Sequence, residues 1–161
     1  MKYLYSCLVF CEGSRDKNFV IALFDLPQFK YHTRKWYFNY DKATGSSPET
    51  ILEQCKKTIS NQEYDLIICL IDLDKLKQDY PKKWQKEQQR LEDKYSGFQI
   101  IWQIDNAEDE YRKVLGDQYR CKQKLNKLAR QKIKEFINSE FWKRILEIIK
   151  NKEAKLDKSL F

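Results

Sequence analysis

The segment from Tyr64 to Ile71 reads YDLIICLI and is the most apolar run in the chain. Its apolar residues are nearly continuous instead of alternating with polar ones, which is typical of a strand that is covered on both faces. Such strands occur in parallel sheets with helices packed on either side. The segment therefore predicts a central strand of an α/β fold, and Asp72 and Asp74 directly follow it.

Strand and helix patterns alternate on both sides of this run. Strand-like segments are expected over residues 3–10, 35–40, 64–71 and 98–104. Helical spacing or a polar stretch follows each of them, over residues 16–26, from Pro48 onward, over 76–94 and from about Asn106. This alternation predicts a mostly parallel four-stranded sheet flanked by helices and joined by right-handed crossovers.

The length and the charge distribution divide the chain into two parts of one domain. A chain of 161 residues suits a single domain. Residues 1–116 hold 18 Lys and Arg against 18 Asp and Glu, whereas residues 117–161 hold 13 against 6, so the net charge of +7 lies entirely in the second part. We expect a core over 1–116 and a basic helical extension over 117–161 packed on it. The extension favours a polyanionic partner, with a solvated Lys-rich surface as the alternative.

Several features favour a cytoplasmic protein without a membrane segment. No stretch approaches about 18 uncharged apolar residues, the length that a spanning helix needs. The first residues, MKYLYSCLVF, run into the acidic CEGSRD and not into the small residues of a cleavage site. The five cysteines form no CxxC pair and have no nearby His, so reduced, buried thiols are expected in place of a zinc site.

Acidic residues follow three of the four expected strands. Glu12 and Gly13 follow the first, Asp72 and Asp74 the third, and an acidic stretch over 105–110 the fourth. Functional groups gather at the carboxyl ends of parallel strands. In extended geometry Asp72 and Asp74 share one side of the strand, where their carboxylates repel unless a cation lies between them. Oxygen ligands in small number are typical of Mg²⁺. A plain turn at Glu12 and a helix cap at the Asp pair are the structural alternatives.

The conjunction of these motifs resembles the Toprim domain, a metal-dependent module of topoisomerases, primases and small nucleases. The matching segments are LVFCEGSRDKNFV and YDLIICLIDLDK, and the resemblance covers about residues 3–115. Within that superfamily the chain looks closest to RloB-like and OLD-type nucleases of prokaryotic defence systems. The resemblance implies a Rossmann-like core, Mg²⁺ or alternatively Mn²⁺ as cofactor, and Glu12, Asp72 and Asp74 as catalytic and metal-binding residues.

The resemblance also implies a further acid after the last strand. RloB-like proteins have one in an Asn-Pro-x-x-Glu-like stretch, and here residues 105–108 read DNAE without the proline. Glu108 is therefore a candidate metal ligand, with Glu110 as a rival.

The implied activity is hydrolysis of phosphodiester bonds in DNA or RNA by a defence or toxin effector. The chain is too short for the additional domains of a topoisomerase or a primase. Five basic residues of the extension would bind the nucleic acid: Lys122, Lys124, Lys127, Arg130 and Lys134.

Other readings of the sequence stay open. The main alternative is a catalytically inactive Toprim-like subunit that binds nucleic acid or docks onto a partner, such as the ATPase of a two-component defence system. A flavodoxin-like regulatory domain is a third alternative. Such a domain would have two acids after its first strand, whereas this chain has a single acid there, Glu12. The aromatic and basic stretch over 29–37 could stack unpaired bases or form strand core. Whether the chain forms a homodimer is open. With a single His32 and no Walker A motif, a nucleophilic triad and built-in ATP binding are not expected.

Overall fold

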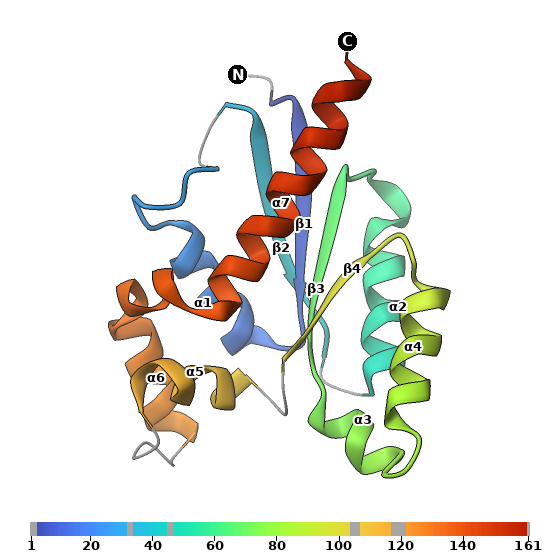
Figure 1. Ribbon diagram of the computed structural model, residues 1–161, viewed down its shortest axis with the longest axis vertical. Coiled ribbons are helices and arrows are strands. Elements are labelled where there is room, and N and C mark those ends of the chain that lie inside the picture. The colour runs from blue at the N-terminus through green and yellow to red at the C-terminus, as the bar shows by residue number, and fades with distance from the viewer. Residues whose placement is uncertain (1–2, 32–33, 45–46, 104–106, 117–121, 161) are drawn as a thin grey trace.

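The computed structural model describes residues 3–31, 34–44, 47–103, 107–116 and 122–160, with the side chains of 107–110 and 122 outside the description. Its centre is a four-stranded sheet in the order β2-β1-β3-β4, in which every pair of neighbours is parallel (Figure 1). The strands are β1 (Tyr5–Cys11), β2 (Trp36–Lys42), β3 (Leu66–Asp72) and β4 (Gln99–Gln103). The predicted α/β class and parallel sheet are confirmed.

The helices follow the strands as the alternating pattern predicts. Between the strands lie α1 (Ser14–Phe24), α2 (Pro48–Thr58) with a short 3₁₀ turn η1 (Ile59–Asn61), and the pair α3 (Asp74–Asp79) and α4 (Trp84–Lys94). After β4 come α5 (Ala107–Leu115), α6 (Lys122–Gln131), the 3₁₀ segment η2 (Ile133–Asn138) and α7 (Glu140–Ser159). The start of α2 shows how the sequence sets a boundary, because Pro48 occupies its first turn and the Ser47 hydroxyl accepts a hydrogen bond from the Thr50 N–H.

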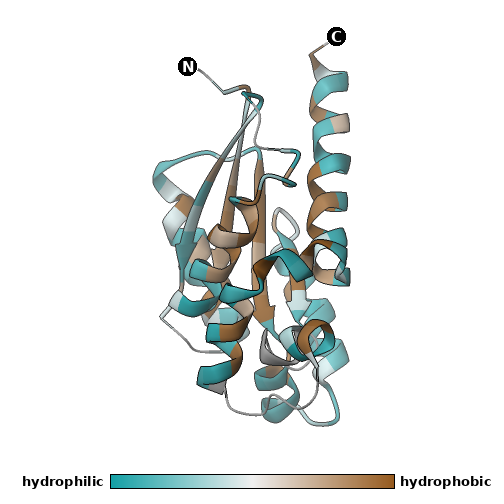
Figure 2. Cartoon of the chain, turned by 90° about the vertical axis from the view of Figure 1, so that its left-hand side faces the viewer, coloured by the Kyte–Doolittle hydropathy of each residue, from teal (hydrophilic) through white to brown (hydrophobic). Residues whose placement is uncertain are grey.

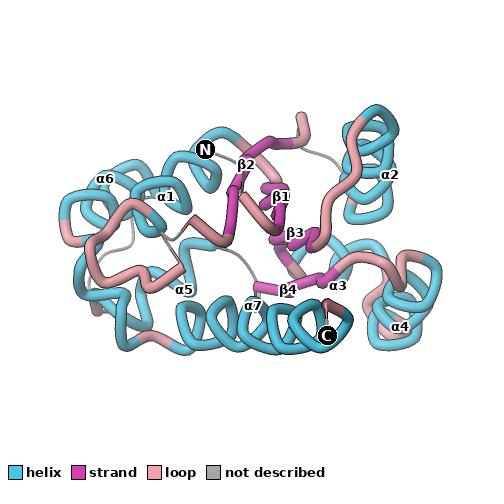
Figure 3. The backbone as a smooth tube through the Cα atoms, turned by 90° about the horizontal axis from the view of Figure 1, so that it is seen from above, coloured by secondary structure: helices cyan, strands magenta, loops and turns pink. Residues whose placement is uncertain are grey.

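The sheet is covered on both faces, which explains the continuous apolarity of β3. Its residues alternate between two cores: Leu66, Ile68 and Leu70 face one, while Ile67, Cys69 and Ile71 face the other. Figure 3 shows α1 and α7 on the first side of the sheet and α2 and α4 on the second. The hydrophobic residues accordingly gather in the strands and on the inward sides of the helices (Figure 2).

The basic extension is part of the main core. Leu125 and Ala129 of α6, Phe136 of η2 and Ile145 of α7 are all buried in the same cluster as Val9 of the central strand β1. Apolar residues spaced three and four apart form the buried stripe, and Lys124, Lys127 and Arg130 of α6 are exposed away from it.

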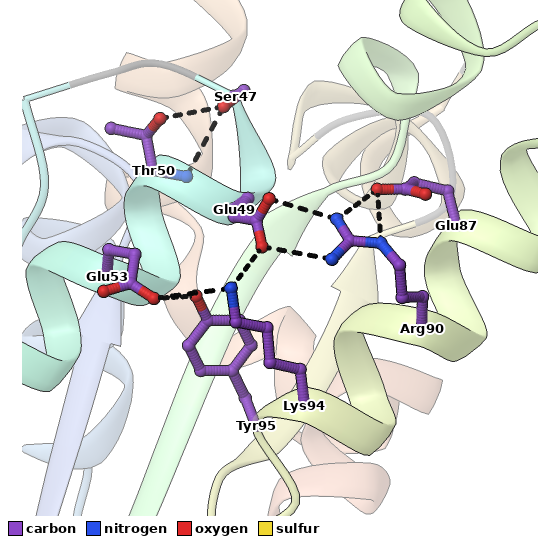
Figure 4. A network of polar contacts seen from close by, with 8 residues as sticks. All are labelled: Ser47, Glu49, Thr50, Glu53, Glu87, Arg90, Lys94 and Tyr95. Atoms are coloured by element: carbon purple, nitrogen blue, oxygen red, sulfur yellow. Dashed lines mark hydrogen bonds and ion pairs between the residues drawn. The ribbon is translucent and has the colours of Figure 1, made fainter.

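On the other side of the sheet, α2 and α4 are joined by a polar network (Figure 4). The Arg90 guanidinium donates to both carboxylate oxygens of Glu49, at 3.0 and 3.3 Å, and also pairs with Glu87 on its own helix. Lys94 lies 3.0 Å from Glu49, and the Tyr95 hydroxyl donates to Glu53. These contacts fix the packing of two helices and lie outside the predicted functional residues.

Candidate functional site

Two of the predicted acidic residues lie beside each other at the carboxyl edge of the sheet. Glu12 follows β1 directly, and Asp72 is the last residue of the neighbouring strand β3. The Asp72 backbone N–H donates a hydrogen bond of 3.0 Å to Oε2 of Glu12. The carboxylate of Glu12 therefore reaches across from the end of one strand to the end of the next. Both residues are partly exposed, although Oδ1 of Asp72 is shielded from solvent.

The glycine after Glu12 is not required by the backbone at this turn. Gly13 precedes α1 with φ −153° and ψ 177°, an extended conformation that any residue adopts. A Cβ placed on it would meet no atom within 4 Å apart from those of its neighbours along the chain. The glycine thus leaves open space beside Glu12 that the fold itself does not need.

Asp74 is placed differently from the sequence expectation. Sharing one side of a strand with Asp72 requires extended backbone, but Leu73 has φ −84° and ψ −19° and leads directly into α3. Asp74 is the first residue of that helix, and its Oδ1 accepts a hydrogen bond of 2.7 Å from the N–H of Lys75. An acid in the first turn of a helix is stabilised by the helix dipole. The geometric reason for pairing Asp74 with Asp72 was therefore wrong.

A metal ion at this edge of the sheet would have few ligands from the described residues. Among the described residues, no three His, Cys, Asp or Glu side chains come close enough together to hold an ion. Mg²⁺ is usually held by one or two carboxylates, with water and substrate phosphate oxygens completing its shell. Glu12 and Asp72 are a donor set of that kind. Glu108 and its rival Glu110, the predicted further ligands, have side chains outside the described residues.

The predicted nucleic-acid-binding residues lie on α6 and η2. Lys124, Lys127, Arg130 and Lys134 are exposed, while the side chain of Lys122 is outside the described residues. Figure 1 shows α5 and α6 at the end of the molecule where β1 and β3 end. The exposed cations of α6 are therefore at the same end as Glu12 and Asp72.

The structure also tests the expectations for the aromatic stretch and for the cysteines. Phe29, Tyr31 and Trp36 are buried in the core, so most of the described part of the aromatic stretch over 29–37 is not available to stack bases; Tyr37 is exposed, and residues 32–33 lie outside the described residues. The four described cysteines are free and buried, as expected, and Cys121 lies outside the described residues. Burial raises the pKa of the Cys7 thiol well above its ordinary value.

Comparisons with protein-family models, with curated proteins and with solved structures found no match to the chain. No helix within the described ranges is both long and apolar enough to cross a membrane. What the protein does is therefore inferred from its own residues.

Proposed function

We propose that the protein is a Mg²⁺-dependent, Toprim-type nuclease that hydrolyses phosphodiester bonds in DNA or RNA, acting in the cytoplasm as a defence or toxin effector. The observation that supports it most is the hydrogen bond from the Asp72 N–H to the Glu12 carboxylate, because it joins the two acidic motifs. The motifs are 60 residues apart in sequence, and nothing local requires them to meet. Carboxylates at adjacent strand ends are a usual setting for chemistry in parallel sheets.

In this proposal the acids hold the metal and the basic helix holds the substrate. Glu12 and Asp72 would bind Mg²⁺, or Mn²⁺ in its place, with Asp74 and an acid of α5 as candidates for further contacts. The bound ion would supply electrostatic stabilisation of the charge that develops on the phosphate oxygens. The open space at Gly13 allows a phosphate to approach the backbone beside Glu12. Lys124, Lys127, Arg130 and Lys134 would neutralise flanking phosphates.

Cleavage assays with matched variants test the proposal. End-labelled single- and double-stranded DNA and RNA are incubated with Mg²⁺, with Mn²⁺ or with EDTA. We expect cleavage only with a divalent ion, and a loss of at least about 100-fold in Asp72→Asn and in Glu12→Gln, because even residues that merely support metal ligands cost about 10- to 100-fold when changed. Asp93→Asn serves as the matched control, since Asp93 is an exposed acid of α4. Cleavage that persists in EDTA or in Asp72→Asn would refute the proposal.

The salt dependence of binding tests the substrate surface. Each neutralised phosphate releases counterions, so on duplex DNA the slope of log affinity against log salt falls by about 0.9 for every phosphate that a variant no longer neutralises. Lys124→Glu and Lys127→Glu should weaken binding and flatten this slope, whereas Lys86→Glu, a charge reversal on the exposed face of α4, should leave it unchanged. An unchanged slope in the α6 variants would move the nucleic acid to another surface.

The placement of Asp74 favours a second candidate function. The helical backbone of Leu73 takes Asp74 off the strand face of Asp72, which leaves fewer acids together for an ion than the sequence motif suggests. A non-catalytic subunit that binds nucleic acid and docks onto a partner, such as an ATPase, fits this arrangement. Thermal unfolding with added Mg²⁺ or Mn²⁺ separates the two. A nuclease site gives a rise in melting temperature that Asp72→Asn abolishes, and an inactive module gives none.

A further inference from the structure

A pocket of about 430 Å³ lies between α1, α5 and α6, apart from the acidic pair. Its walls carry three cationic side chains, Arg15 from the first turn of α1 and Lys127 and Arg130 from α6. None of the described residues that line it is acidic. A pocket of this size accommodates a small ligand, and its charge selects an anion.

The contribution of α6 to the pocket is a continuous stripe of polar residues. Gln123, Asn126, Lys127 and Arg130 all line it and are spaced i, i+3, i+4 and i+7, which places them on one face of the helix. Lys124 belongs to a different face and does not line the pocket. The pocket is therefore built by a defined face of α6 and not by its basic composition in general.

Asn126 is the feature that indicates a ligand. Asn126 is a lining residue of the pocket and is only 9% exposed, and its amide nitrogen Nδ2 is buried with no hydrogen-bond partner. A buried polar group without a partner is unfavourable, and native proteins rarely keep one unless a ligand, an ion or a water completes it. An amide N–H donor beside three cations matches an acceptor-rich anion such as phosphate.

The other wall of the pocket is aromatic. Phe19 of α1 and Tyr111 of α5 line it, and their ring centroids are 4.7 Å apart. Both residues are almost fully buried, so they present an apolar floor and not projecting rings. A ligand that joins a phosphate to an apolar or aromatic body, as a nucleotide does, would meet both kinds of surface.

The charge of the pocket distinguishes between kinds of phosphate. A phosphomonoester carries about −1.5 to −2 charge at pH 7 and three terminal oxygens, whereas a phosphodiester inside a strand carries one negative charge. The three positive charges of the pocket exceed the single negative charge of a phosphodiester and match a phosphomonoester better. Arginine in particular binds such groups through two parallel hydrogen bonds.

We propose that this pocket binds the phosphomonoester of a nucleotide, either the terminal phosphate of a nucleic acid strand or a free mononucleotide. The strand-end source rests on the proposed function, because Arg15 comes only three residues after Glu12, so a strand end held at Arg15 lies within about 11 Å of the Glu12 backbone. The pocket itself does not depend on any metal.

Binding measured in EDTA tests the pocket separately from catalysis. Fluorescence anisotropy compares DNA and RNA 10-mers that carry a 5′-phosphate, a 3′-phosphate or only hydroxyl ends, with AMP as the free mononucleotide. We expect one phosphorylated end to bind about tenfold more tightly than the hydroxyl ends, a size typical of hydrogen bonds to a charged group. Efficient competition by AMP would identify the free nucleotide as the source, and weak competition the strand end.

Variants locate the preference within the pocket. Arg130→Gln and Asn126→Leu should remove the preference for the phosphorylated end, whereas Lys124→Gln, on the same helix but off the pocket, should retain it while lowering overall affinity. Thermal melting checks that Asn126→Leu is folded, and Arg130→Gln changes only an exposed side chain. Asp93→Asn, on the exposed surface of α4 and outside both sites, should bind like the unchanged protein.

The outcomes separate the two proposals. Equal binding of phosphorylated and hydroxyl ends without competition by AMP, or a preference that survives Arg130→Gln, overturns the pocket even where Mg²⁺-dependent cleavage occurs. A phosphate preference in a protein that never cleaves supports the pocket and refutes the nuclease.

Discussion

Replacing Phe136 by alanine tests whether the C-terminal extension is part of the same folding unit as the sheet. Phe136 lies in η2 and is 1% exposed. Its ring meets Phe19 of α1 at a centroid distance of 4.9 Å and Tyr111 of α5 at 5.8 Å, both nearly edge to face. The ring thus connects the extension to a helix from the first part of the chain and to the helix after β4.

The expected decrease in stability follows from the burial of this ring. Phe→Ala substitutions in protein cores cost about 3–5 kcal/mol, because the transfer free energy of the removed ring is joined by the cost of a cavity. Two edge-to-face contacts, each worth about 0.5–1.5 kcal/mol beyond the buried area, place Phe136 in the upper part of that range. In a chain of this length each kcal/mol lowers the melting temperature by about 2–4 °C, so a loss of about 4–5 kcal/mol should lower it by roughly 8–20 °C.

Urea denaturation followed by two probes measures this decrease. Tryptophan fluorescence reports on the sheet through Trp36 and Trp102 and on α4 and α7 through Trp84 and Trp142, while far-UV circular dichroism reports on the helices. We expect one transition by both probes, with a lower midpoint and an unchanged dependence on urea. Tyr80→Ala is the control, since Tyr80 is 43% exposed and its removal should cost within about 0.5 kcal/mol.

Two results would refute the reasoning. A decrease below about 1 kcal/mol would mean that Phe136 is not enclosed as described. Separate transitions, in which the helical signal disappears before the fluorescence of the sheet changes, would mean that residues 122–160 fold as an independent unit.

Three further outcomes can be measured on the same protein. Arg90→Met should cost only about 0–1 kcal/mol, and less at high salt, because Arg90 and Glu49 are 45% and 38% exposed. The hydrogen bond from Lys35 lowers the pKa of Asp157 in the folded protein. The ionised Asp157 therefore stabilises the fold fully above about pH 4, and this contribution is lost as the pH falls through the lowered pKa. In Asp157→Asn the urea midpoint should consequently decrease less steeply with acid. Burial raises the pKa of Cys7, so its contribution is complete below about pH 8.5 and is lost as the pH rises, and Cys7→Ala should reduce the alkaline destabilisation in the same titration.

The order and type of the elements could be predicted from hydrophobic period alone. Each expected strand is present, with bounds shifted by about two residues; the run at 64–71, for instance, becomes β3 (Leu66–Asp72). The sheet order β2-β1-β3-β4 was not predicted, because a strand covered on both faces can pair with any neighbour. The polar stretch over 76–94 contains the end of α3 and all of α4. Two helices form there instead of one because Pro81 cannot continue a helix.

The candidate site was predictable to the extent that it depends on strand ends. Glu12 and Asp72 follow or end adjacent parallel strands, so the topology alone brings them together. Asp74 was misplaced because its position depends on the backbone of one residue, Leu73, whose helical φ and ψ no periodic pattern specifies. The pocket could not be predicted because it depends on long-range packing. It combines α1 with helices about 100 residues further along the chain. Its signal in the sequence is the polar spacing of Gln123, Asn126, Lys127 and Arg130, opposite the buried stripe of Leu125 and Ala129.

The structure also sharpens where the excess positive charge of the extension acts. In α7 the basic residues are interspersed with Glu140, Glu147, Glu153 and Asp157, and the last two pair with Lys35 just before β2 begins. The segment of α6, in contrast, contains four basic residues and no acid. Unbalanced positive charge is thus concentrated on the helix at the carboxyl end of the sheet (Figure 1). The acids lie at the strand ends and the cations line a separate pocket, so the two groups do not neutralise each other. One nucleic acid could therefore contact the cations directly and the acids through a bound metal ion.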